Sequence, residues 1–210
     1  MHPFRIEACV ETLQQAVHAQ AMGAHQIELC TQLDQDGLTP SRALIRQVMA
    51  AVDLPVKVMI RPRPGNFVYS RDDREAAIRS VCLCLEEGIG RIVTGALTPD
   101  GHLDLDWITA LAACGDDLRI TVHKAIDACQ RPLEEVRNLT QISSVDSILS
   151  SGGAATARAG APVLREMITV SGDRLTIIAA GRVTFENIHD VHDLIGASVY
   201  HGRRIVPGLL

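Results

Sequence analysis

The stretch RIEACVETLQQAVHAQAMGAHQIELC, residues 5–30, decides the fold. Its two ends, Arg5 to Cys9 and Gln26 to Cys30, alternate apolar and polar side chains, which predicts two β-strands. The alanine-rich segment between them, Glu11 to Met22, predicts a helix. A strand, a helix and a second strand within so few residues indicate a βαβ unit, in which the two strands are parallel and the crossover is right-handed.

The same alternation continues along the whole chain. Six further strands are expected at Val56 to Arg61, Arg91 to Thr94, Leu118 to His123, Val145 to Ser150, Leu175 to Ala179 and Ala197 to Tyr200. Six further helices are expected at Ser41 to Val52, Arg71 to Glu87, Leu105 to Ala113, Pro132 to Leu139, Thr156 to Thr169 and Thr184 to Leu194. Eight strands in 210 residues predict an α/β protein, a TIM-like (β/α)8 barrel, as a single domain over residues 1–210. An open, doubly wound sheet is the alternative, which the lack of a GxGxxG motif after the first strand disfavours.

The chain has little room for a final helix. After Tyr200 only residues 201–210 remain, and Gly202, Pro207 and Gly208 interrupt them. We therefore expect a barrel whose last helix is absent or truncated, with its open flank covered by another subunit of a homodimer.

Charged side chains are expected inside the barrel. In each strand the apolar set must face the helices, which leaves Glu7, Glu28, Arg61 and His123 facing the lumen near the carboxyl ends of their strands. The loops at those ends carry the active sites of such barrels. Because burying several ionisable groups costs several kcal/mol each unless they are paired, the four residues predict either an internal ion-pair network or a functional site. Lys124 should face the helices.

Two thiols share this predicted lumen. Cys9 and Cys30 lie on neighbouring strands with inward parity, and Met59 offers a thioether sulfur nearby. Sulfur ligands are those that Cu(I) prefers. The alternative is that both cysteines are small buried hydrophobic residues, which is common for free cysteine.

Two glycine-rich turns follow late strands and precede helices. They contain Ser151, Gly152 and Gly153 in the first and Gly181 and Arg182 in the second. Backbone N–H groups at the start of a helix bind phosphate well, so these residues predict a phosphate site. Glycines that merely permit tight turns are an equally good explanation.

Composition excludes several classes of function. A net charge of -5 and only six aromatic residues, Phe, Tyr and Trp together, speak against nucleic acid as a partner. No stretch approaches the roughly 20 apolar residues that a membrane span needs. Six scattered cysteines predict free thiols and a cytoplasmic location. No organic cofactor is predicted.

Five segments resemble signature blocks of the CutC family. They are ELCTQLDQDGLTPS (28–41), VMIRPRPGNFVYS (58–70), VTGALTPDGHLD (93–104), TVHKAID (121–127) and ILSSGG (148–153). The resemblance implies a (β/α)8-type barrel, a cytoplasmic and often dimeric protein, and a role in copper homeostasis.

Two functions follow from these observations. The first is a CutC-like copper homeostasis protein that binds Cu(I) through Cys9 and Cys30. The second is a barrel enzyme of unassigned reaction that acts on a small anionic or phosphorylated metabolite, with Glu7 or Glu28 as general base, His123 as acid or base and Arg61 as anion clamp. The sequence leaves open whether the protein is an enzyme.

Overall fold

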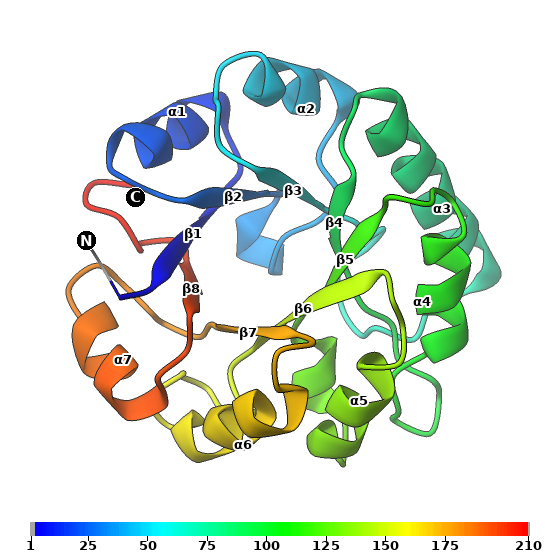
Figure 1. Cartoon of the computed structure of the whole chain (residues 1–210). Coiled ribbons are helices and arrows are strands. Elements are labelled where there is room, and N and C mark those ends of the chain that lie inside the picture. Colours follow the sequence, from blue (N-terminus) through cyan, green and yellow to red (C-terminus); the bar gives the residue numbers. More distant parts are fainter. Residues whose placement is uncertain (1–2, 210) are drawn as a thin grey trace.

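The computed structural model describes residues 3–209 and shows a closed parallel barrel (Figure 1). Each strand pairs with the next, and the eighth pairs with the first, so the open sheet is excluded. The strands are β1 (Arg5–Val10), β2 (Gln26–Leu29), β3 (Val56–Met59), β4 (Arg91–Thr94), β5 (Arg119–Val122), β6 (Val145–Ser150), β7 (Thr176–Ala179) and β8 (Val199–Gly202). This arrangement confirms the predicted (β/α)8 architecture.

Seven α-helices surround the strands in the described part of the chain. They are α1 (Leu13–Ala21), α2 (Arg42–Met49), α3 (Arg71–Glu86), α4 (Leu105–Ala112), α5 (Pro132–Leu139), α6 (Ala161–Ser171) and α7 (Ile188–Ile195). Two 3-10 helices, η1 (Leu33–Gln35) and η2 (Lys124–Ala128), lie in loops that follow strands. None of the helices within residues 3–209 is both long and apolar enough to cross a lipid bilayer.

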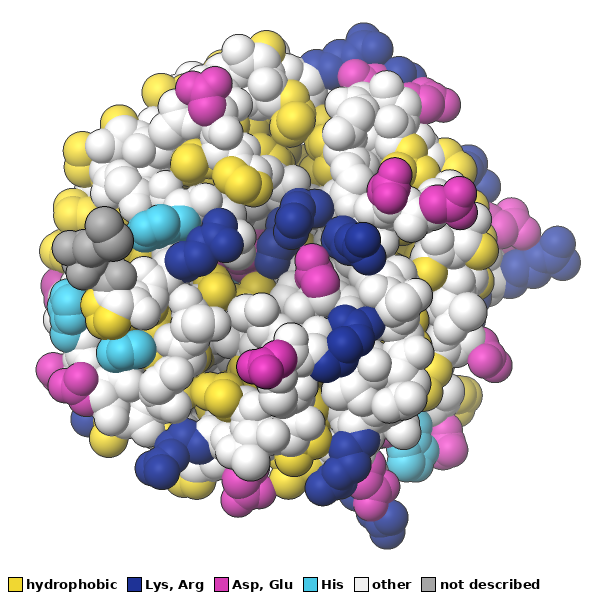
Figure 2. Space-filling view, in the orientation of Figure 1, with side chains coloured by type: hydrophobic (Ala, Val, Ile, Leu, Met, Phe, Trp, Pro, Cys, Tyr) yellow, Lys and Arg dark blue, Asp and Glu magenta, His cyan; other side chains and the backbone are white. Residues whose placement is uncertain are grey.

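Figures 1 and 2 look along the barrel axis from the amino-terminal ends of the strands. The strands follow one another clockwise in Figure 1, which right-handed crossovers produce only from that end. Lys and Arg side chains gather over the middle of this face in Figure 2. Exposed arginines begin three of the strands, and one of them, Arg91, pairs with Asp146 at 3.4 Å. The loops that follow the strands, where an active site is expected, therefore lie on the far side.

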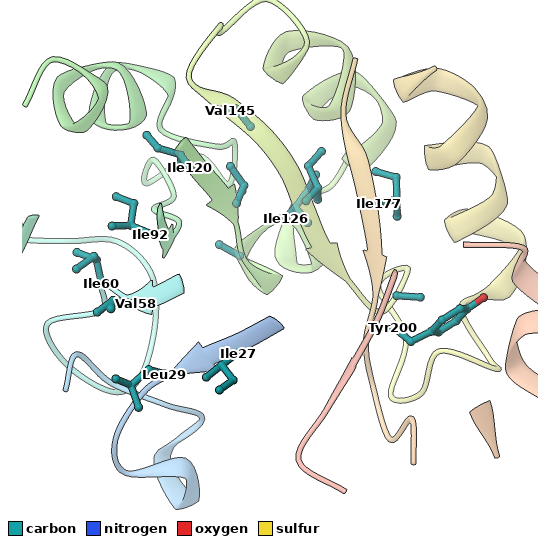
Figure 3. Packing of buried hydrophobic residues seen from close by; sticks show 14 of the residues in the cluster. Ile27, Leu29, Val58, Ile60, Ile92, Ile120, Ile126, Val145, Ile177 and Tyr200 are labelled. Carbon is teal, nitrogen blue, oxygen red and sulfur yellow. The ribbon is translucent and has the colours of Figure 1, made fainter. Parts of the chain in front are cut away.

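The main core lies between the strands and the helices. The strand side chains predicted to face the helices are buried there, as Figure 3 shows for Ile27, Leu29, Val58, Ile60 and Ile120. Burial of apolar surface contributes about 25 cal/mol per Å², so this layer supplies most of the driving force for folding. The other strand faces point into the lumen.

The eighth strand lies two residues further along the chain than the sequence predicted. It spans Val199–Gly202 because Tyr200 is the helix-facing residue: its hydroxyl accepts a hydrogen bond from the Ala197 N–H at 3.0 Å and lies 3.1 Å from Nδ1 of His192. The correction matters for function, since it places His201 in the lumen beside Glu7.

No helix follows β8 up to residue 209, as predicted. The tail instead lies along the flank between α1 and α7 (Figure 1). Ile205, Val206 and Leu209 are buried, and Nε2 of His18 in α1 donates to the Pro207 carbonyl at 2.7 Å. The protein's own tail therefore covers part of the flank for which the sequence analysis expected a second subunit.

The loop after β6 depends on one glycine, which gives a test of the fold. Gly152 has φ +68°, and a Cβ there would lie 2.4 Å from the Gly160 carbonyl oxygen. Gly196 has a similar φ of +71° but open space around it. We expect Gly196→Ala to lose about 1–2 kcal/mol of unfolding free energy from the left-handed backbone alone. Gly152→Ala should lose at least about 2 kcal/mol more, because the backbone must also move. Urea unfolding at pH 7 measures both, and equal losses would contradict the close packing of this loop.

Candidate functional site

A buried carboxylate organises one side of the lumen. Strand register places Glu7 beside Gln26 and His201, and Glu28 beside Lys57. The Glu7 carboxylate lies 2.9 Å from Nζ of Lys57, accepts from Nε2 of Gln26 at 2.6 Å, and lies 2.9 Å from Nδ1 of His201. Glu7 is fully buried, so these three partners replace the water that its charge has lost.

The partners decide the protonation state of Glu7. Burial alone would raise its pKa, but Lys57 and His201 outweigh burial and lower the pKa to about 2. Glu7 is therefore charged at neutral pH, and it does not line the cavity described below. This geometry favours a structural ion pair for Glu7 over the general-base role considered from the sequence.

Glu28 has a different environment. Its Oε1 accepts from the Cys9 thiol at 3.4 Å and lies 3.8 Å from Nε2 of His201, while its Oε2 has no hydrogen-bond partner among the described residues. Burial raises the pKa of this carboxyl group. The two glutamates are thus differentiated by their surroundings, and only Glu28 reaches the cavity.

The two predicted thiols meet. The Sγ atoms of Cys9 and Cys30 lie 3.7 Å apart, and Cys30 Sγ donates to the Val10 carbonyl at 3.4 Å. Both belong to a small buried cluster whose other members are Leu33, Met59 and Val93. The hydrogen bond with Cys30, burial and the neighbouring Glu28 raise the pKa of the Cys9 thiol. Cys9, Glu28 and Cys30 place one possible metal ligand each within 4.8 Å of the others, as do Glu7, Glu28 and His201.

Arg61 and His123 meet around a third residue. The Arg61 guanidinium lies 5.3 Å from the centre of the Phe67 ring, and that ring lies 4.9 Å from the His123 ring. Arg61 donates to the carbonyls of Gln35, Gly37 and Gly65, which ties two loops together. Nδ1 of His123 accepts from a backbone N–H, and Nε2 has no partner among the described residues. Burial, together with the nearby Arg61, lowers the pKa of His123 to about 3, so the ring is neutral.

A cavity of about 820 Å³ opens at the carboxyl ends of the strands. It is the place where most of the predicted site residues converge. Those that line it are Cys9, Glu28, Arg61, His123, Ser151, Gly153, Gly181 and Arg182. Glu7, Cys30 and Gly152 lie behind this lining. Its size suits a small organic ligand.

The first predicted phosphate loop is filled from within. The Asp127 carboxylate accepts hydrogen bonds from the Ser151 N–H at 2.9 Å and the Gly153 N–H at 3.0 Å, and from the hydroxyls of Ser150 and Ser151. The N–H of Gly152 donates to the Ser150 hydroxyl. These donors are therefore not free for an external phosphate. Ser151 and Gly153 bind Asp127, and Gly152 binds Ser150.

The expectation for Lys124 was wrong. Strand β5 ends at Val122, and the chain then turns into η2, so strand parity no longer applies. Lys124 is exposed and lines the cavity.

Sequence reasoning missed Lys57 and His201. Lys57 has the same parity as Met59 and Arg61, so the alternation itself could have identified it. His201 was hidden because the strand was ended at Tyr200. Continuing the alternation by one residue would have placed it in the lumen.

A closed (β/α)8 barrel with a polar, thiol-containing cavity at the carboxyl ends of its strands defines a TIM-barrel protein with a ligand site. The chain belongs to the CutC family, whose match covers residues 4–206. It is 34% identical over 197 residues to the CutC family protein of Photobacterium profundum, covering 94% of this chain and 80% of that relative. It is 34% identical over 198 residues to the human copper homeostasis protein cutC homolog, and the match covers 94% of this chain and 72% of that relative. The structure of CutC from Streptococcus agalactiae superposes with a TM-score of 0.90 at 26% identity, covering 97% of this chain and all of that one.

The ion pair at Glu7 predicts a pH dependence of stability. A carboxyl whose folded-state pKa lies below its unfolded value stabilises the fold above the unfolded pKa, here 4.5, and loses that contribution as pH falls toward about 2. The difference in unfolding free energy between the wild type and Glu7→Gln should be on the order of 3 kcal/mol at pH 6 and should shrink steadily between pH 5 and pH 2. Denaturant unfolding across this range measures it.

Glu75 on α3 provides the control, since it is half exposed and its ion pairs within residues 3–209 are with Arg71 and Arg79 at the surface. Glu75→Gln should change stability by less than about 0.5 kcal/mol at every pH. A Glu7→Gln difference that does not depend on pH would show that the carboxylate charge is not what stabilises the barrel.

Proposed function

We propose that this protein binds Cu(I) through Cys9 and Cys30 as part of a role in copper homeostasis. The observation that carries the proposal is the 3.7 Å separation of the two thiol sulfurs within a buried cluster that also contains Met59. A metal–sulfur bond is about 2.3 Å long, so one ion can bridge two sulfurs at this separation with little movement. Membership of a family with relatives named for copper homeostasis supports the same function.

The donor set suits a soft, singly charged ion. Thiolate and thioether sulfur are the ligands that favour Cu(I), whereas a site for a hard divalent ion would be built mainly of oxygen. Cys9 and Met59 line the cavity, so the ion would reach the sulfurs from the cavity mouth. Both thiols must lose their protons on binding, and the adjacent polar cluster of Glu28 and His201 lies within reach of the Cys9 sulfur. A cytoplasmic location and a homodimeric assembly belong to the same proposal.

The enzyme alternative receives less support. Glu7 is paired, charged and set behind the cavity lining, which leaves Glu28 as the candidate base and the neutral His123 as its partner. An acid–base pair needs two groups that reach the same reacting atom. Glu28 and His123 make their hydrogen bonds with other groups within residues 3–209, whereas the two thiols contact each other at 3.7 Å, so copper binding has the more direct geometric support.

An anaerobic Cu(I) titration tests the proposal. The reduced protein is titrated against a competing chromogenic Cu(I) chelator, and the wild type should retain one equivalent that Cys9→Ser/Cys30→Ser loses. Cys82→Ser/Cys114→Ser is the matched control, because this pair also lies close together but at the surface. Circular dichroism confirms that each variant folds. Loss of copper in the control, or its retention in the Cys9/Cys30 variant, would place the metal elsewhere.

Met59 gives a graded test of the same site. Met59→Leu keeps the volume and apolar character of the side chain and removes only the sulfur. If the thioether is a third ligand, the affinity for Cu(I) should fall about tenfold while the stoichiometry stays at one. An unchanged affinity in the same chelator competition would limit the site to the two thiols.

A further inference from the structure

We propose that the mouth of the cavity is a separate site for a small phosphorylated molecule, whose phosphate binds between Lys124 and Arg182. This site is distinct from the sulfur cluster at the cavity floor and does not depend on copper binding. The cavity walls present more positive than negative side chains.

The cavity wall carries three acids, Glu28, Asp36 and Asp127, and five lysines and arginines. Asp127 is held by four hydrogen bonds from residues 150–153, and Asp36 lies at the rim beside Arg203, 3.8 Å away. Glu28 contacts Cys9 and lies near His201. The cations of the wall, Arg61, Lys124, Arg182, Arg203 and Arg204, therefore outnumber its acids.

Three cations of the wall have no acidic partner among residues 3–209. Arg61 is only 4% exposed and donates to backbone carbonyls alone. Lys124 and Arg182 are exposed to the cavity and form no ion pair in this part of the chain. A guanidinium is always charged, and a charge withdrawn from water requires a counter-charge. The cavity consequently favours an anion.

Lys124 and Arg182 belong to the same side of the rim. Lys124 begins η2, whose Asp127 is bound by the loop after β6. Gly181 packs on that same loop: a Cβ at Gly181 would lie 2.9 Å from the Cβ of Ser151, and its carbonyl accepts from the Ala157 N–H at 2.8 Å. The loops after β5, β6 and β7 thus form one continuous wall. Lys124 lies on the first of these loops and Arg182 on the last.

The backbone at Arg182 is strained in a way that exposes hydrogen-bond donors. Arg182 has φ +55°, in the left-handed region that non-glycine residues rarely occupy, and Asn187 holds it there by donating to its carbonyl at 2.9 Å. The N–H groups of Gly181 and Arg182 have no acceptor within the described residues. Consecutive free backbone N–H groups beside two cations form the arrangement that binds a phosphate oxygen.

The deeper part of the cavity indicates an organic body attached to the phosphate. Nε2 of His123 and Oε2 of Glu28 are unpartnered there, and both side chains are more than nine-tenths buried. Phe67, Leu149 and Ala180 add apolar side chains to the lining of the same cavity. A ligand with hydroxyl or carbonyl groups would satisfy the two polar atoms, so the expected class is a small phosphorylated polyol or sugar rather than free phosphate.

Calorimetry on the metal-free, reduced protein tests the site. Ribose 5-phosphate, inorganic phosphate, ribose and acetate are titrated separately at constant ionic strength. We expect ribose 5-phosphate to bind more tightly than inorganic phosphate, and ribose and acetate to give no measurable heat. Arg182→Gln and Lys124→Gln should each weaken ribose 5-phosphate binding at least tenfold.

Arg79→Gln serves as the control, because Arg79 is an exposed residue of α3 outside the cavity and loses the same charge. It should bind ribose 5-phosphate as the wild type does. Absence of binding to either phosphate compound, equal binding of acetate, or equal weakening in all three variants would overturn the proposal. None of these outcomes bears on the copper titration, so each proposal can fail alone.

Discussion

The buried charge of Glu7 is the interaction on which the rest of the structure depends. Its carboxylate contacts Gln26 of β2, Lys57 of β3 and His201 of β8, and so joins four adjacent strands. The barrel closes where β8 pairs with β1. In a complete (β/α)8 barrel, an eighth helix would pack against the outside of these strands. Within residues 3–209, no helix follows β8 and the tail packs outside that seam. The contacts of Glu7 therefore stabilise, from the lumen side, the strands that lack a helix packed on their outer side.

Glu7 also determines, through His201, how the polar groups at the cavity floor are arranged. Because Glu7 binds Nδ1 of His201, the other ring nitrogen faces Glu28, which in turn contacts the Cys9 thiol. The opposite part of the lumen is filled by Leu149, Ile178, Ala180 and Val199, which bring no charge. The buried ion pairs and the paired thiols therefore lie in the half of the barrel formed by β1, β2, β3 and β8. On the other strands the buried polar side chains of Thr121 and Ser147 are uncharged and satisfy each other at 2.7 Å.

The sequence predicted the fold well because period-two alternation is a local property, and each strand reports its own inward face. It placed Cys9, Cys30, Glu28 and His123 in the lumen for that reason. Alternation gave the wrong orientation for Lys124. This residue lies beyond the end of β5, where side chains no longer alternate between the two faces of the sheet. The pairing of Asp127 with Ser151 could not be predicted either, since it joins loops 24 residues apart whose separation in space depends on the closed barrel. Alternation along a strand predicts which face of the sheet a side chain lies on, whereas the hydrogen-bond partner of that side chain depends on tertiary structure.

The two proposed ligands would occupy opposite ends of one cavity without competing for donors. The floor offers soft sulfur, which binds phosphate poorly, and the rim offers cations and N–H groups, which do not bind Cu(I). A cationic rim also repels a free metal cation electrostatically, and the penalty falls with salt. Copper would therefore cross the rim most readily as part of an anionic complex, such as one with thiolate ligands, and exchange its sulfur ligands for Cys9 and Cys30 at the floor. If both ligands bind as proposed, the positive rim would select how copper arrives as well as which organic molecule binds.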